Sequence, residues 1–200
     1  RAVELLTPNT TPFTFVNRGG VSLRTGGNSP STTVGYGRIQ PNSASGTPSG
    51  LAIFGFRQGG VLVTEAAVPA SALLQSGRLY AEVSGPVNTG LAIANPNNQA
   101  ATITFNFTDT TGQPFGSRTT TIAANSQIAA FLNQAPFNGG SAVHGTFSFS
   151  SSVPISVVAL RGLTNERSEF LITTLPVLDL SAPVPTGETI IFPHFAEGGG

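Results

Sequence analysis

Several residue types are missing from this 200-residue chain. It contains no cysteine, methionine or tryptophan, and its nine basic residues are all arginine. The absence of cysteine excludes disulfides, thiolate metal sites and cysteine nucleophiles, and it makes the chain indifferent to an oxidising environment. No apolar run approaches the roughly 20 residues that a spanning helix needs, so we expect no membrane span.

Charge is also scarce. Only 9% of the residues are charged, and nine acidic residues balance the nine basic ones. A net charge of zero argues against nucleic acid as a partner, because binding to phosphates needs a positive surface. It gives equally little reason to expect attraction to anionic lipid. Between copies of the chain it provides little of the like-charge repulsion that opposes self-association.

What the chain does have is a series of short alternating segments. The clearest is Ala101–Thr108, in which Ile103, Phe105 and Phe107 alternate with threonine and asparagine, the pattern of a half-buried strand. No segment keeps a helical period beyond about two turns. Turn signals about every 8 to 12 residues favour an all-β fold of antiparallel Ig-like or fibronectin-like β-sandwich repeats.

Other segments carry weaker strand signals. Ala70–Gly77 fits one helical turn or a linker, and Gln127–Leu132 fits a strand or a short helix. We expect one sandwich core lined by Ile103, Phe105, Phe107, Phe147, Phe149, Val157, Ala159 and Ile172. The further expected strands are Pro12–Val16, Val21–Arg24, Val34–Ile39, Leu51–Arg57, Val61–Ala67, Leu79–Val83, Gly90–Asn95 and Arg118–Ile122.

The stretch Gly145–Pro176 has an earlier counterpart at Gly35–Pro69. Both contain an apolar run that ends in arginine, a polar turn and a strand that closes on proline. Arg161 and Glu169 lie 104 residues after Arg57 and Glu65, and the two members of each pair are eight apart. We interpret this as a tandem repeat. Residues 1–77 would be the back half of a first repeat, 78–185 a complete repeat, and 186–200 the first strand of a further repeat or a donor strand.

Four segments carry a resemblance to a known group of proteins: FPHFAEGGG, NTGLAIANP, SSVPISVVALRGLTNERSEFLITTLPV and GLAIFGFRQGGVLVTEAAVPA. They resemble the tandem Ig-like repeats of large secreted bacterial proteins of unknown function, common in acidobacteria. The similarity covers Val34 to Gly200. It implies an exported, multidomain β-sandwich protein at the cell surface or outside the cell, and it supplies no catalytic residues. The chain lacks natural-looking ends, so we expect a piece of something longer.

Catalytic and metal-binding arrangements are poorly supported. The two histidines, His144 and His194, are isolated in sequence, and no nucleophile elbow occurs. Glu166 and Glu169 are close together, but they lie at a turn beside Arg167, where surface ion pairing is the better interpretation. We therefore expect no enzyme, no metal and no cofactor.

Two features remain as candidate interaction sites. The pairs Arg57/Glu65 and Arg161/Glu169 form domain or ligand contacts, or else bridge the strands of each hairpin and set their register, which we favour. The segment Thr189–Phe195 is an expected strand with no domain of its own, and its apolar side chains are candidates for pairing with an open sheet edge: Ile190, Ile191, Phe192 and Phe195.

These features predict a structural protein, a segment of a cell-surface or filament-forming array assembled through β-strand contacts. Its partner would be a second copy, head to tail, or flanking repeats of the same polypeptide. The alternative is a surface adhesion or glycan-binding module. Glycan sites favour aromatic platforms, and this chain offers only Tyr36 and Tyr80 for that purpose.

Overall fold

The structure is a computed structural model that describes residues 2–4, 10–26, 30–32, 34–42, 44–194 and 196–198. The fold is all-β, and the described residues include no helix, so none that could cross a membrane. The chain divides into two compact units, Arg1–Gly35 and Tyr36–Gly200. We describe each unit by itself.

The first unit has little regular structure. Its strands β1 (Ala2–Glu4) and β2 (Ser22–Arg24) pair in parallel, which confirms the strand expected at Val21–Arg24. The strand expected at Pro12–Val16 is wrong, because these residues form no regular element. They lead into a turn at Asn17 and Arg18, closed by a hydrogen bond from Gly19 N to Val16 O.

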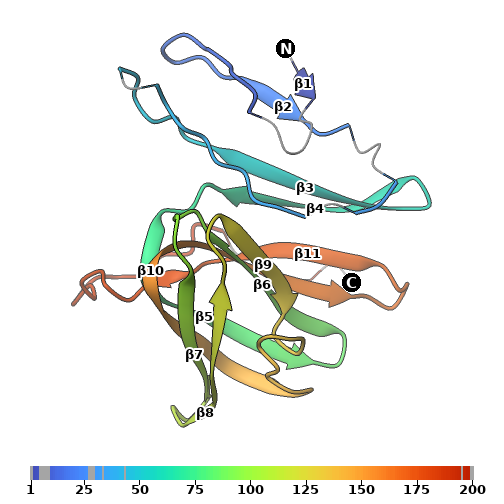
Figure 1. The fold of residues 1–200 in the computed structure, drawn as a ribbon. Coiled ribbons are helices and arrows are strands. Elements are labelled where there is room, and N and C mark those ends of the chain that lie inside the picture. The colour runs from blue at the N-terminus through green and yellow to red at the C-terminus, as the bar shows by residue number, and fades with distance from the viewer. Residues whose placement is uncertain are drawn as a thin grey trace. The chain divides into compact units, whose positions relative to one another are not determined.

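The second unit is built on an eight-stranded antiparallel sheet that curls into a half-barrel (Figure 1). Residues of alternating polarity form most of these strands, as the sequence predicts. The strands are β5 (Leu73–Ser84), β6 (Val87–Asn95), β7 (Ala101–Asp109), β8 (Pro114–Ile122), β9 (Ser126–Phe131), β10 (Val143–Thr164), β11 (Phe170–Leu175) and β12 (Leu178–Asp179).

Strand β10 organises this sheet. Its first half lies between β5 and β7, and its second half lies between β6 and β11. The register with β5 shifts between Ser150 and Ile155. Pro154 lies in that interval and has no N–H to donate, so a regular ladder cannot continue through it. The change of neighbours along one 22-residue strand curls the sheet around a core.

The core lies inside this curled sheet. Seven of the eight expected core residues, all except Ile172, are buried in one cluster. Phe105 packs its ring against Phe137 and Phe147, with ring centroids 5.6 and 5.2 Å apart. Ile172 on β11 is partly exposed and lies outside the cluster, so its assignment to the core is wrong.

A separate hairpin precedes this sheet. It consists of β3 (Leu51–Gln58) and β4 (Val61–Pro69), as expected, and turns at Gly59 and Gly60, whose φ values of 57° and 83° favour glycine. One face of β4 contacts the edge strand β11. Ile172 N donates to Thr64 Oγ1 at 3.2 Å, and Thr174 Oγ1 donates to Ala67 O at 2.7 Å.

Four other expectations have different outcomes. Leu73–Gly77 belongs to β5, so neither a helical turn nor a linker is correct for Ala70–Gly77. The ambiguous segment Gln127–Leu132 is largely strand β9. Residues 34–39 form no strand, and 189–194 have no regular structure, whereas Phe195 lies outside the described residues. An isolated apolar run does not form a strand unless a neighbouring strand accepts its backbone hydrogen bonds.

Candidate functional site: the Glu82 cluster and the β3 surface

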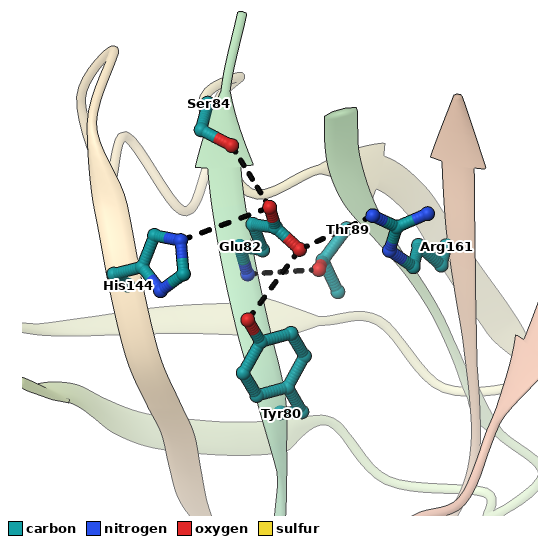
Figure 2. A network of polar contacts seen from close by, with 6 residues as sticks. All are labelled: Tyr80, Glu82, Ser84, Thr89, His144 and Arg161. Carbon is teal, nitrogen blue, oxygen red and sulfur yellow. Dashed lines mark hydrogen bonds and ion pairs between the residues drawn. The ribbon is translucent and has the colours of Figure 1, made fainter. Parts of the chain in front are cut away.

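A cluster of polar side chains surrounds the carboxylate of Glu82, whose side chain is 13% exposed (Figure 2). Its Oε1 accepts a hydrogen bond from Ser84 Oγ at 2.9 Å and lies 3.7 Å from His144 Nε2. Its Oε2 lies 3.5 Å from an Arg161 Nη and 3.4 Å from the Tyr80 hydroxyl. We call this group the Glu82 cluster: Tyr80, Glu82, Ser84, Thr89, His144 and Arg161.

The strand pairing explains how residues so far apart in sequence meet. His144, near the start of β10, is directly opposite Glu82 of β5. Arg161, near the end of β10, is opposite Thr89 of β6. The tight turn between β5 and β6 brings Thr89 beside Glu82, whose backbone N–H donates to Thr89 Oγ1 at 3.0 Å. The two ends of β10 therefore meet at one carboxylate.

This arrangement is suited to holding strands together. Both Glu82 oxygens are engaged, and a partly buried charge is tolerated only when it has such partners. The part of the chain that the structure describes contains no group of three residues able to hold a metal ion. The cluster thus ties β5 to both ends of β10.

The pKa of the Tyr80 phenol reflects its place in this cluster. Loss of water around its phenol raises the pKa of Tyr80 above its ordinary value. The Glu82 carboxylate raises it further through its charge and hydrogen bond, and Arg161 opposes the rise. The phenol therefore remains protonated and available as a donor to Glu82 at neutral pH. Ionisation removes this stabilisation as the pH rises through the folded-state pKa.

The titration of Tyr80 tests this environment. The chain has two tyrosines, so a Tyr36→Phe variant leaves Tyr80 as the only phenol. We expect its absorbance titration to have a midpoint above about 10, the ordinary value for tyrosine. Adding Glu82→Gln should lower the midpoint, whereas Glu65→Gln on the exposed hairpin should leave it unchanged. A midpoint that does not change on Glu82→Gln would contradict the contact between the Tyr80 hydroxyl and the Glu82 carboxylate.

The first of the two expected charge pairs is not formed. Arg57 is opposite Leu62, and its Nη1 donates to Gly60 O of its own turn at 3.1 Å. Glu65 is opposite Gly55, in the middle of β4. Among the described residues no ion pair joins Arg57 to Glu65. Both side chains are on exposed positions of the hairpin.

The second pair is also divided between different partners. Arg161 contacts Glu82, while Glu169 contacts Arg167, with 2.6 Å between Glu169 Oε2 and an Arg167 Nη. Hydrogen bonds from Asn165 and then Arg167 lower the pKa of Glu169. The ion pairing expected at this turn is therefore present, but the cross-strand bridge between Arg161 and Glu169 is absent. Equal spacing in sequence does not give equivalent positions here, because Glu65 lies within β4 and Glu169 precedes β11.

The sequence analysis did not predict that the residues of the Glu82 cluster lie together. His144, which is isolated from other chemistry-bearing residues in sequence, lies in β10. The available signal was the alternation along β5, where Tyr80, Glu82 and Ser84 alternate with apolar residues. That signal places the three side chains on one face. It does not indicate which distant strand supplies histidine and arginine.

A second feature is the apolar exterior of the first hairpin. Every residue of β3 is exposed, and β3 pairs with no described strand other than β4. The large exposed apolar side chains of β3 and of the start of β4, which we call the β3 surface, are Leu51, Ile53, Phe54, Phe56, Val61 and Leu62. Contiguous exposed apolar side chains on a soluble chain commonly mark an interaction site, and an unpaired strand edge offers free N–H and C=O groups.

The expected donor segment is equally exposed. Ile190, Ile191 and Phe192 are 83%, 76% and 83% exposed. Within the described residues, positions 183–194 make no backbone hydrogen bond to another segment. The structure thus leaves two apolar elements of this chain without a backbone partner among the described residues: the outer edge of β3 and the segment 186–194.

The motif Asn95-Pro96-Asn97 has a structural explanation. Asn95 is fully buried, and its Nδ2 donates to the carbonyl oxygens of Gln99, Ile122 and Ala123. Its Oδ1 accepts from the backbone N and the side-chain Nδ2 of Asn97. A buried amide with all these partners fixes the turn after β6 against the end of β8.

Comparisons with known proteins add little. No family model matches the chain, and no curated protein matches it. The crystal structure of Thermotoga maritima 1070 is similar to 52% of this chain over 93% of its own, at 13% identity and a TM-score of 0.44. The Anabaena sensory rhodopsin transducer covers 44% of this chain and 95% of its own, at 21% identity and a TM-score of 0.35. At these scores neither carries an inference about this chain.

Proposed function

We propose that this chain is a structural repeat protein of the cell surface or of an extracellular filament, and that its copies assemble through β-strand contacts. The observation that supports the proposal best is the exposed β3 strand, which is apolar and has one unpaired edge. Strand addition to such an edge satisfies backbone groups and buries apolar side chains together.

Composition supports the same function. The net charge of zero imposes little repulsion between copies. The lack of cysteine fits an oxidising location, and the resemblance to secreted bacterial repeats points to export. The alternative, a glycan-binding module, would use the exposed ring of Tyr80, which is 43% exposed. Saturable binding on a glycan array by non-assembling protein would favour that alternative.

Assembly is the direct test of the proposal. We expect the purified chain to form concentration-dependent polymers in sedimentation and electron microscopy. Raising the salt concentration should not dissolve them, because apolar contacts are not screened as charges are. Ile53→Lys should shift the chain toward monomer, since it puts a charge at a position of β3 that is 64% exposed.

A matched variant separates a local effect from a general one. Thr121→Lys adds the same charge at an exposed position of β8, away from the β3 surface, and should leave assembly unchanged. Both variants should retain the thermal unfolding of the parent chain. A parent chain that stays monomeric at every concentration would refute the proposed function.

A further inference from the structure

We propose that the unpaired edge of β3 binds the segment Glu188–His194 of a second copy as an antiparallel strand, with Arg57 opposite Glu188. This rests on the proposed function and specifies its contact. Each copy would then offer one free edge and one free strand. Such a contact joins different surfaces of the two copies, so it continues head to tail.

The hairpin formed by the second half of β10 and β11 shows which kind of strand pairs with the free edge of such a hairpin. The second half of β10 and β11 form an antiparallel pair like β3 and β4. Strand β6 occupies the other edge of β10 along Ser156–Leu163, again antiparallel. Strand β3 is the counterpart of this part of β10, and no described strand occupies the corresponding edge. The missing neighbour of β3 is therefore an antiparallel apolar strand.

The unpaired edge of the hairpin is on β3 and not on β4, because the outer side of β4 already contacts β11. Ala66 and Val68 of β4 are buried, and Thr64 and Ala67 receive hydrogen bonds from β11. Phe56 on β3 meets the ring of Phe170 edge-on at 6.0 Å. The hairpin is thus held on its β4 side and open on its β3 side.

The segment 188–194 fits the open edge in size and chemistry. Its seven residues, ETIIFPH, match the seven residues Leu51–Arg57, LAIFGFR. Among Asp, Glu, Lys and Arg, the first stretch contains only Glu188 and the second only Arg57, so their pairing brings no like charges together. In an antiparallel arrangement with Arg57 opposite Glu188, Ile191 is beside Phe54 and Phe192 is beside Ile53. Apolar cross-strand pairs of this kind are the main side-chain contribution to sheet stability.

Charge sets the register. The guanidinium of Arg57 has no carboxylate partner among the described residues, and Glu188 is exposed. Pairing these two residues fixes all the others, because a slip by one residue moves every side chain to the opposite face. In this register Ile190 is opposite Gly55, a position over which the side chain of Leu62 lies.

The lack of native cysteine allows a clean cross-linking test. One full-length chain carries Ile53→Cys and another carries Phe192→Cys, and the two are mixed and oxidised. We expect the mixed disulfide dimer as the main product, because residues directly opposite in antiparallel strands are close enough to be bridged. The matched control replaces Phe192→Cys by Ile191→Cys, which directs the thiol to the other face and should cross-link much less.

The outcomes distinguish this contact from the proposed function. Polymers without the Ile53–Phe192 cross-link would overturn the contact and leave assembly standing. Absence of polymers and of cross-links would overturn both. A chain that carries both cysteines and closes into a cross-linked monomer at high dilution would show that its own segment occupies the edge, which also overturns the second-copy assignment.

Charge exchange gives an independent readout. Arg57→Glu and Glu188→Arg should each weaken association, by roughly fivefold if the pair contributes as other exposed ion pairs do. In the double variant Arg57→Glu/Glu188→Arg, the pair is re-formed between copies and the association should recover. Two single effects that add in the double variant would contradict the proposed register.

Discussion

Replacing Phe105 with alanine should lower the free energy of unfolding by roughly 3–5 kcal/mol, the usual cost of removing a buried aromatic ring. Phe105 is only 1% exposed. Its ring packs against those of Phe137 and Phe147, which also contact each other, and it meets Phe107 edge-on at 6.3 Å. A cavity at this point removes contacts from β7, β10 and the loop that carries Phe137. Chemical denaturation followed by circular dichroism measures the loss.

Phe192→Ala is the matched control, because it removes the same ring from a side chain that is 83% exposed. Measured at concentrations too low for assembly, it should change stability by no more than about 0.5 kcal/mol, as surface substitutions generally do. If Phe105→Ala costs less than about 1 kcal/mol, the typical cost of an ordinary substitution, the three rings do not form the packed centre of the fold.

The sequence predicted the core because its signal is local. In β7, Ile103, Phe105 and Phe107 alternate with threonine and asparagine, and burial follows directly from the two-residue period of a strand. The hairpin of β3 and β4 was equally predictable, since Gly59-Gly60 between two apolar runs fits few other structures. The error at Ile172 arises because β11 is an edge strand, and the face of an edge strand is not fully covered.

The Glu82 cluster could not be predicted in the same way. His144 and Arg161 reach Glu82 only because β10 changes neighbours near Pro154 and brings both of its ends back to β5 and β6. Nothing within the segment 143–164 indicates which strands flank it. The repeated charges were misinterpreted for a related reason. Arg and Glu are eight positions apart in both hairpins, but the two turns differ in length, so the two glutamates lie at different points relative to their strands.

For the β3 surface, the sequence and the structure differ in the burial of the side chains. Its residues are apolar, and the sequence alone favours burial for a run such as Leu51–Phe56. The structure leaves these residues exposed, and β3 pairs with no described strand other than β4. A long, apolar, unpaired strand is a known hazard for aggregation, and this is the reason for proposing a strand partner for β3.

Gly145→Ala should have an effect comparable to the loss of the Phe105 ring. Gly145 has φ of +152°, a conformation that side-chain-bearing residues rarely adopt. It is opposite Asp109 in the β7–β10 ladder, and an added Cβ would overlap the carbonyl oxygen of Thr108. Backbone strain of about 1–3 kcal/mol and overpacking of about 1–3 kcal/mol act together. We expect a loss of about 3 kcal/mol or more, measured by denaturant unfolding.

Gly140→Ala separates the two causes. Gly140 also has a positive φ, +92°, but an added Cβ there would meet no atom within 4 Å. It should therefore cost only the strain, and the difference between the two variants measures the close approach of β7 to β10. Equal losses would show that conformation alone decides the requirement for glycine at 145. A stable Gly145→Ala chain would show that β10 can move away from Thr108, and that the start of this long strand is not fixed by its neighbour.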